Sequence, residues 1–193
     1  WFGFNAGSAL VSDGSAGMTM LVTHLAAACG SLAWMTVEWI KHGKPSVLGI
    51  VTGMVAGLGT VTPASGYIGP IGGVALGVAG GVVCYFATQF IKRGLKLDDS
   101  LDVFPVHGVG GAMGTLLAAV FGAAALGGVG FDRSITGQLG VQAIGVLAAV
   151  GYTALVSYVI FKIVGAITPL RVDEEEEDQG LDIICHDERG YNF

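Results

Sequence analysis

His107 is a candidate for chemistry, because this ionisable side chain lies inside an otherwise apolar stretch. His107 follows a segment with three aspartates and precedes a long run of apolar and small residues. A helix is predicted to begin near Asp99 to Asp102, since acidic side chains suit the positive end of a helix dipole. Pro105 then falls in the first turn, where its missing N–H costs little. If this helix crosses a bilayer, an ionisable ring at that depth usually faces inward and marks a pathway.

His107 has two interpretations. A buried histidine that donates one hydrogen bond to a carbonyl is ordinary in a soluble core, but in a membrane span its second ring nitrogen also needs a partner. Helical spacing places Val103, Gly110, Gly111 and Gly114 on the face of His107. A polar ring over such small or apolar neighbours favours a narrow pore lined by His107.

The first residues form a second candidate site. Trp1, Phe4 and Ser8 recur at the spacing of one helix face. Aromatic core packing explains this spacing and is the favoured interpretation. The alternative is a cation site, because aromatic faces attract cations and the Ser8 hydroxyl supplies an acceptor.

The other histidines carry weaker arguments. His24 invites pairing with His107 as a proton relay, but nothing fixes their helices as neighbours, so a structural role is predicted. His42 and His186 are expected to be exposed in a basic loop and in the tail. Serine-hydrolase, phosphate-loop and zinc-protease motifs are absent, the three cysteines lack metal-ligand spacing, and neither an enzyme nor a cofactor is predicted.

The composition is that of a membrane protein. The mean hydropathy is +0.69, with 52% hydrophobic and 12% charged residues. The net charge of −6 comes from one acidic run, residues 173–178, and no basic stripe suits a nucleic acid. We therefore expect an all-α polytopic membrane bundle in contact with lipid, and exclude nucleic-acid binding.

The elements that must position these residues are apolar runs. Residues 1–168 are expected to form transmembrane helices and residues 169–193 a tail. The predicted spans cover a partial first helix at about 1–12, then about 18–40, 47–61, 70–91, 101–126 and 138–168.

Glycine spacing predicts close helix contacts. Small residues at every fourth position let helix backbones approach closely. This spacing occurs in the fourth span at Gly69, Gly73, Gly77 and Gly81, in the third at Gly53 and Gly57, and in the fifth at Gly110 and Gly114.

Charge predicts the orientation. The loops after the second and fourth spans hold five of the six basic loop residues, and the sixth is Arg133 in another loop. By the positive-inside rule both basic loops, and with them the tail, are expected to be cytoplasmic.

Several motifs together resemble one family, the ammonium transporters (Amt/Mep/Rh), and the Amt branch in particular. They run along essentially the whole chain: WFGFNAGSA (1–9), GKPS (43–46), VTPASGYIGP (61–70), DDSLDVFPVHGVGG (98–111), LGGVGF (126–131) and the tail GLD…HDERGYN (180–192). The resemblance implies the second half of an eleven-span homotrimeric fold, from within the sixth span to the cytoplasmic tail, with an N-terminal half missing.

The resemblance also implies residue roles. Phe4 corresponds to one ring of a phenylalanine gate, Ser8 to a hydroxyl of the outer ammonium site, and Trp1 to a pore-lining ring. His107 corresponds to the second of twin histidines, with Val103 lining the inner passage. In the tail, Gly180, Asp182, Tyr191 and Asn192 match a regulatory segment that responds to PII-type proteins.

Two functions follow from this resemblance. The first is nitrogen uptake by ammonium or ammonia transport through a hydrophobic pore in each subunit of the plasma membrane, with deprotonation at the aromatic site and passage along the histidines. The second is an ammonium-sensing receptor of the same fold that signals through its tail. A purely structural half of another transporter is a weaker third reading.

Overall fold

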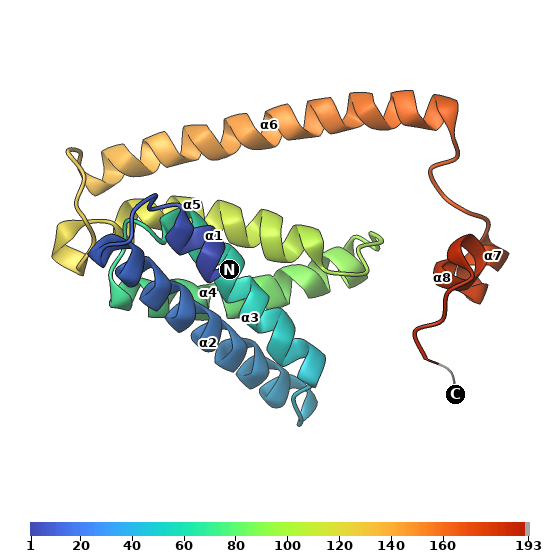
Figure 1. Ribbon diagram of the computed structural model, residues 1–193, viewed down its shortest axis with the longest axis horizontal. Coiled ribbons are helices and arrows are strands. Elements are labelled where there is room, and N and C mark those ends of the chain that lie inside the picture. The colour runs from blue at the N-terminus through green and yellow to red at the C-terminus, as the bar shows by residue number, and fades with distance from the viewer. Residues whose placement is uncertain (192–193) are drawn as a thin grey trace. The chain divides into compact units, whose positions relative to one another are not determined.

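The computed structural model describes residues 1–191, and their regular secondary structure is entirely helical. The fold class is therefore confirmed as all-α. The chain divides into two compact units, Trp1–Val146 and Leu147–Phe193. The helices labelled in Figure 1 are α1 (Phe2–Gly7), α2 (Gly14–His42), α3 (Val47–Val61), α4 (Pro70–Gln89), α5 (Gly110–Phe121), α6 (Ile135–Ile167), α7 (Glu174–Gln179) and α8 (Leu181–His186).

Short helices of other types extend or connect these elements. Two are 3-10 helices, Thr62–Ala64 and Ala124–Leu126, and two are π-helices, Phe90–Gly94 and Phe104–Val109. Counted with these extensions, five helical segments are long and apolar enough to cross a membrane: Gly14–His42, Val47–Ala64, Pro70–Gly94, Phe104–Phe121 and Ile135–Ile167.

The first two helices differ from their expected bounds. α1 ends at Gly7 and not near residue 12, because the chain turns and Leu10 adopts a positive φ of 60°. α2 begins at Gly14, where the Asp13 carboxylate accepts hydrogen bonds from the backbone N–H groups of Ser15 and Ala16. A hydrogen bond from the Ser15 hydroxyl and these backbone bonds lower the pKa of Asp13 below its usual value.

The helix that carries His107 begins later than predicted. Asp102 has a φ of 56°, so the chain is not helical there. Asp99 instead caps the helix from outside, and its two carboxylate oxygens accept hydrogen bonds from the N–H groups of Val103 and Phe104, each at 2.9 Å. The helix starts as the π-helix Phe104–Val109, continues as α5 and ends at Phe121, five residues before the predicted end.

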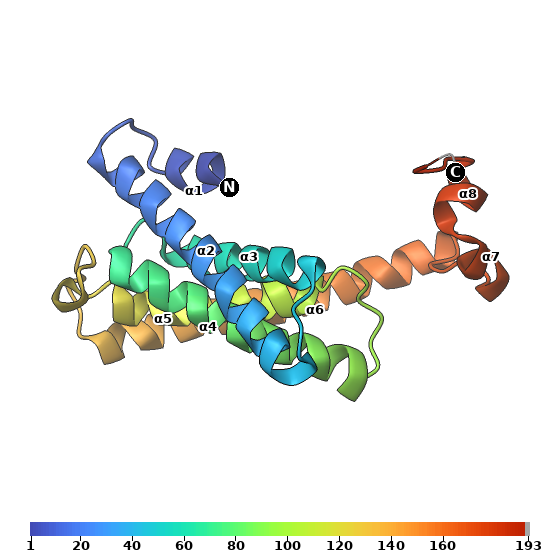
Figure 2. The ribbon, with the colours of Figure 1, turned by 90° about the horizontal axis from the view of Figure 1, so that it is seen from below.

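The glycines of α4 contact α2, as their spacing predicts. A Cβ on Gly73 would lie 3.0 Å from the carbonyl oxygen of Val22, and one on Gly77 2.7 Å from the Cα of Ala26. Gly53 and Gly57 of α3 also face α2. Figure 2 shows α2 running diagonally across α3 and α4. The prediction of close helix contacts is confirmed for these glycines, because no side chain separates the backbones, whereas Gly69 precedes α4 and faces Gly127.

The core of the first unit consists of two apolar clusters between these helices. One includes Val22 and Leu76 with no exposed surface, and the other includes Trp34, Tyr85 and Val106. The rings of Trp34 and Tyr85 meet edge to face, with their centroids 5.4 Å apart. These contacts hold α2, α4 and the π-helix of His107 together.

α6 has no buried residue along its 33 residues. At 1.5 Å per residue it is about 50 Å long, more than the roughly 30 Å of a bilayer core. It begins at Ile135, three residues before the predicted start, and the boundary between the two compact units lies within it. A helix that is apolar on all sides is typical of a membrane span.

The tail in the second unit is locally ordered. The acidic run, residues 173–178, begins at the N-cap of α7, whose first turn has a capping box between Asp173 and Glu176. The Arg171 guanidinium pairs with the Glu177 carboxylate. Gly180 separates α7 from α8 with a φ of 96°, a conformation that glycine adopts without steric cost.

Candidate functional site

His107 lies in the π-helix, and its ring stacks on the indole of Trp1. The two ring centroids are 6.3 Å apart and the planes differ by 15°. His107 is exposed in this chain, and Trp1 is 45% exposed. Residues 106 positions apart in the sequence therefore come together, while the imidazole remains exposed. π-helical turns occur often at functional sites.

Hydrogen bonds to the neighbouring helices position α1. The indole N–H of Trp1 donates to the Thr62 hydroxyl at 2.7 Å, and that hydroxyl donates to the carbonyl of Leu58 at 2.7 Å. The buried side chain of Asn5 donates to the Thr23 hydroxyl on α2 at 3.1 Å. In this way two polar contacts fix the aromatic face that Trp1 presents to His107.

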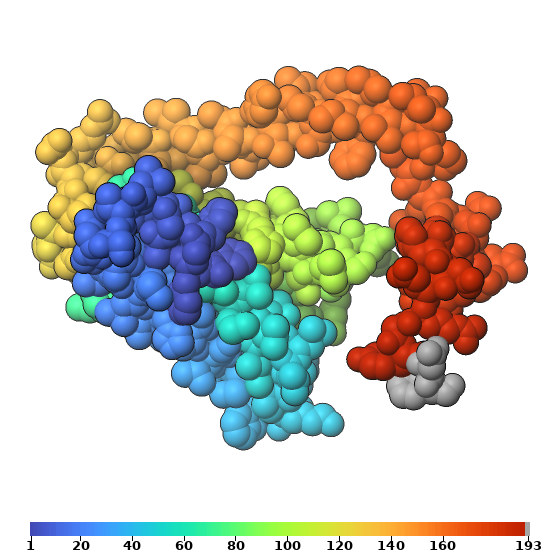
Figure 3. All heavy atoms as spheres, in the orientation of Figure 1, coloured from blue at the N-terminus to red at the C-terminus, as the bar shows by residue number. Residues whose placement is uncertain are grey.

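Phe4 contacts the ring of Trp1, and Ser8 contacts Phe4. The Phe4 ring is 6.2 Å from the Trp1 ring, tilted by 58°, and remains 68% exposed. The Ser8 hydroxyl donates to the carbonyl of Phe4 at 2.8 Å, so its lone pairs remain available. α1 lies on the outside of its unit, where its darkest-blue atoms are visible in Figure 3.

A cavity of about 270 Å³ lies next to Ser8. Its polar lining comes from Asn5, Ser8, Ser15, Thr19, Thr62, Ser65 and Tyr67. Most of these groups are hydroxyls, whose oxygens accept hydrogen bonds from a donor such as an ammonium ion. Ser8 and Thr62 connect this cavity to the residues around Trp1.

A second cavity, of about 430 Å³, lies next to His107. His107 and Val103 both line it, together with Phe104, Gly108, Ile91, Leu97, Asp98 and Asp99. Val103 is 53% exposed. His107 thus borders an apolar cavity with two carboxylates at its rim, while its ring stacks on Trp1.

The glycines expected beside His107 have another role. Gly110 and Gly114 face Thr60 of α3, where an added Cβ would clash. An added Cβ on Gly111 would have no neighbouring atom within 4 Å. Gly59 of α3 lies beside the imidazole, and its added Cβ would lie 3.7 Å from Nδ1 of His107. The prediction of a glycine-lined pore face is wrong for Gly110 and Gly114, because they serve helix packing.

His24 does not pair with His107. Its ring lies 6.0 Å from the ring of Phe2, tilted by 41°. This contact agrees with the predicted structural role. Sequence reasoning missed Thr62 and Gly59, and only the position of Thr62 in the TPASG segment offered a signal.

A comparison of the whole chain with known protein families shows which family it belongs to. The model of the Ammonium Transporter Family matches residues 1–191. The chain belongs to this family.

Known ammonium transporters are similar over the whole chain. It is 40% identical to the ammonium transporter of Bacillus subtilis over 99% of its own length, and 43% identical to that of Aquifex aeolicus over its full length. It covers 48% and 46% of those two proteins. The chain therefore spans about half the length of the relatives that it matches.

Solved structures agree with this assignment. A protein described as "Sensor Amt Protein" superposes with a TM-score of 0.87 at 33% identity, over 95% of this chain and 45% of its own. Mep2 of Saccharomyces cerevisiae superposes with a TM-score of 0.80 at 33% identity, over 91% of this chain and 42% of its own. Together with the five apolar helices, these comparisons identify an integral membrane protein with the ammonium transporter fold.

The tail residues expected to be regulatory lie in the second unit. Gly180 and Asp182 lie at the junction of α7 and α8, and Tyr191 is 78% exposed. Asn192 lies outside the described residues. Within residues 1–191, no three His, Cys, Asp or Glu side chains are grouped so that they could hold a metal ion.

Proposed function

We propose that this chain forms part of a pore that conducts ammonium or ammonia across the plasma membrane. The observation that carries the proposal is the stacking of Trp1 on His107, between a hydroxyl-lined cavity and an apolar one. The named activity of the relatives supports the choice of substrate.

Ammonium is held at Trp1, Phe4 and Ser8. Two exposed aromatic faces and a hydroxyl with free lone pairs suit a small cation that hydrocarbon excludes. The ion loses its proton there to the acceptor nitrogen of the histidine pair, the neutral molecule passes His107 and leaves along Val103, and the proton follows separately along the histidines. Neutral imidazole donates at one nitrogen and accepts at the other, so it can pass a proton along a pair of histidines. The partner histidine belongs to a segment outside residues 1–191.

The basic ends of α2 and α4 face the cytoplasm, and the tail lies on the same side. Lys41 and Lys44 follow one span, and Lys92, Arg93 and Lys96 follow the other. The complete assembly is a homotrimer, and PII-type proteins act on the tail at Gly180, Asp182, Tyr191 and Asn192. The exposed apolar surface of α6 is consistent with lipid or further polypeptide around it.

The test uses a chimera in which residues 1–193 replace the matching part of the Bacillus subtilis relative. Uptake of labelled methylammonium is measured in cells that lack their own transporter. His107→Ala should reduce uptake about tenfold or more, since tenfold corresponds to the loss of about 1.4 kcal/mol of interaction with the passing molecule. His24→Ala is the matched control, because it removes the same ring from a site that packs on Phe2. Equal uptake in the two variants would remove His107 from the mechanism.

The second candidate is an ammonium receptor, favoured by the likeness to the "Sensor Amt Protein". It predicts that the purified chimera binds ammonium while methylammonium uptake stays at the background of empty cells. If methylammonium uptake exceeds that background and saturates with ammonium, the protein is a transporter.

A further inference from the structure

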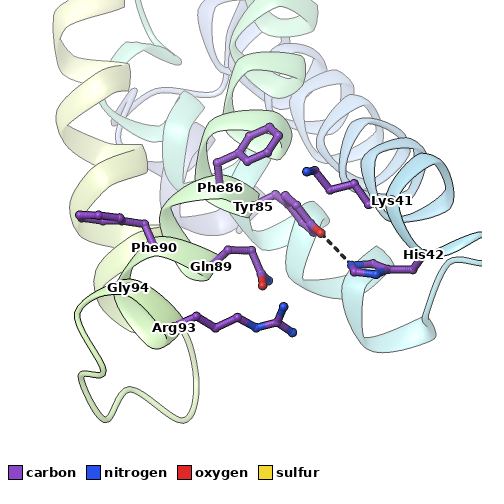
Figure 4. A pocket seen from close by; sticks show the side chains of 8 residues that line it. All are labelled: Lys41, His42, Tyr85, Phe86, Gln89, Phe90, Arg93 and Gly94. Atoms are coloured by element: carbon purple, nitrogen blue, oxygen red, sulfur yellow. Dashed lines mark hydrogen bonds between the residues drawn. The ribbon is translucent and has the colours of Figure 1, made fainter.

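A cavity of about 500 Å³ lies between the C-terminal end of α2 and the end of α4. Figure 4 shows polar side chains entering it from both helices: Lys41 and His42 from α2, and Gln89 and Arg93 from α4 and its π-helical extension. None of the residues around His107 lines this cavity. It is a separate site from the proposed pore.

The cavity carries positive charge that no carboxylate balances. Lys41 and Arg93 line it, and no Asp or Glu does. Within residues 1–191 neither side chain forms an ion pair, whereas the neighbouring Lys92 is paired with Asp102 at 2.8 Å. Two cations facing one cavity without a counter-ion favour an anionic ligand.

The donors around the cavity suit an anion with several oxygens. The Arg93 guanidinium offers a planar fork, Lys41 a point charge and Gln89 an amide N–H. Lys41 contacts the ring of Phe86, with its Nζ atom 5.1 Å from the ring centroid, and this contact holds Lys41 beside the cavity. The Nε2 atom of His42 lies 3.0 Å from the Tyr85 hydroxyl, which fixes the opposite wall. A phosphate group presents the oxygens that such donors bind.

The position of the cavity points to a lipid as the source of the phosphate. Phe86 and Phe90 border it and are 47% and 62% exposed on a helix apolar enough to span a membrane. The ends of membrane-spanning helices lie at the depth of the headgroups. A ligand here therefore meets cations at the head and aromatic surface along an apolar body.

We propose that this cavity binds the headgroup of an anionic phospholipid. Lys41 and Arg93 contact the phosphate oxygens, and the acyl chains lie along Phe86 and Phe90. Under the proposed topology this face is cytoplasmic, where anionic lipids attract basic segments.

Lipid binding to residues 1–193 in detergent, measured by native mass spectrometry, tests the proposal. Phosphatidylglycerol should bind more tightly than phosphatidylcholine. Arg93→Gln should weaken phosphatidylglycerol binding about tenfold, and Arg93→Lys should weaken it less, because it keeps the charge and loses only the fork. Both substitutions are at an exposed position, so the fold should persist.

Lys44→Gln is the matched control, because it removes one positive charge from the adjacent loop without touching the cavity. It should change the affinity by less than about threefold once 0.5 M salt screens the exposed charges. Equal losses in Arg93→Gln and Lys44→Gln would reduce the effect to diffuse surface charge and overturn the site. Competition by inorganic phosphate at equal concentration would overturn the lipid as the ligand. The measurement needs no transport, so its failure is distinct from failure of the proposed function.

Discussion

Trp1 makes two contacts that depend on each other. Its ring stacks on His107, and its indole N–H donates to Thr62 on the helix that follows α3. The hydrogen bond restricts the rotation of the indole, so the stacking distance depends on a hydroxyl that never touches the imidazole. Thr62 is thus a positioning residue for the candidate site.

We predict that Thr62→Val weakens transport in the chimera while the fold persists. Valine has nearly the same shape and removes the acceptor of the Trp1 hydrogen bond, whose loss costs about 0.5–1.5 kcal/mol. Methylammonium uptake should fall about two- to tenfold. Thr62→Ser keeps the hydroxyl and should restore most of the activity. Equal activity of the valine and serine variants would contradict a positioning role for this hydroxyl.

Among the elements, α2 organises the first unit, because α3 and α4 both approach it through glycines. The contacts run along the middle of α2, from Val22 to Trp34. Backbone contact of this kind leaves no room for rotamer adjustment, so a single methyl group displaces a whole helix.

Gly77→Ala should therefore be strongly destabilising. Its Cβ would lie 2.7 Å from the Cα of Ala26 and 2.9 Å from the Cβ of Cys29. We expect a loss of about 1–3 kcal/mol, seen as a lower temperature of unfolding in detergent. Gly111→Ala is the control, since nothing lies within 4 Å of its added Cβ, and it should unfold at or above the wild-type temperature. Similar losses in both variants would mean that the contact with α2 does not determine the effect.

The elements show which features a sequence can predict. Hydropathy located the apolar helices, and glycine spacing found the contacts of α4 with α2, because both signals are local and periodic. The π-helix at Phe104–Val109 and the left-handed Asp102 are not periodic, so the start of the fifth span was misplaced.

The sequence alone predicts that His107 belongs to the site, because the residue lies deep inside an apolar run. The residues that surround His107 in space can be identified only from the fold. The hydrogen bond from Trp1 to Thr62 joins residues 61 positions apart, beyond the reach of any local pattern. Helical spacing also placed Gly110 and Gly114 on the face of His107, but α3 covers them, which agrees instead with the close helix contacts that their four-residue spacing predicts.

The molecule as a whole has a predicted orientation that labelling can test. With the native cysteines replaced by alanine, single cysteines are placed at Lys44, Lys96 and Arg133. In right-side-out vesicles, a membrane-impermeant thiol reagent should label only Arg133→Cys, because the basic loops stay in the cytoplasm. Lys44→Cys and Lys96→Cys should react after permeabilisation. Reaction of Lys44→Cys and Arg133→Cys from the same side would contradict the topology.

The wide turn at Phe104–Val109 has a consequence for how this family varies in length. A π turn contains one residue more than an α turn, so the chain can lose one residue there without breaking the helix. Such a deletion would rotate the aspartate segment by about 100° relative to the membrane-embedded part. Single-residue gaps between homologues should therefore fall in this hexapeptide, and proteins with the shorter form should present a different set of side chains to the imidazole.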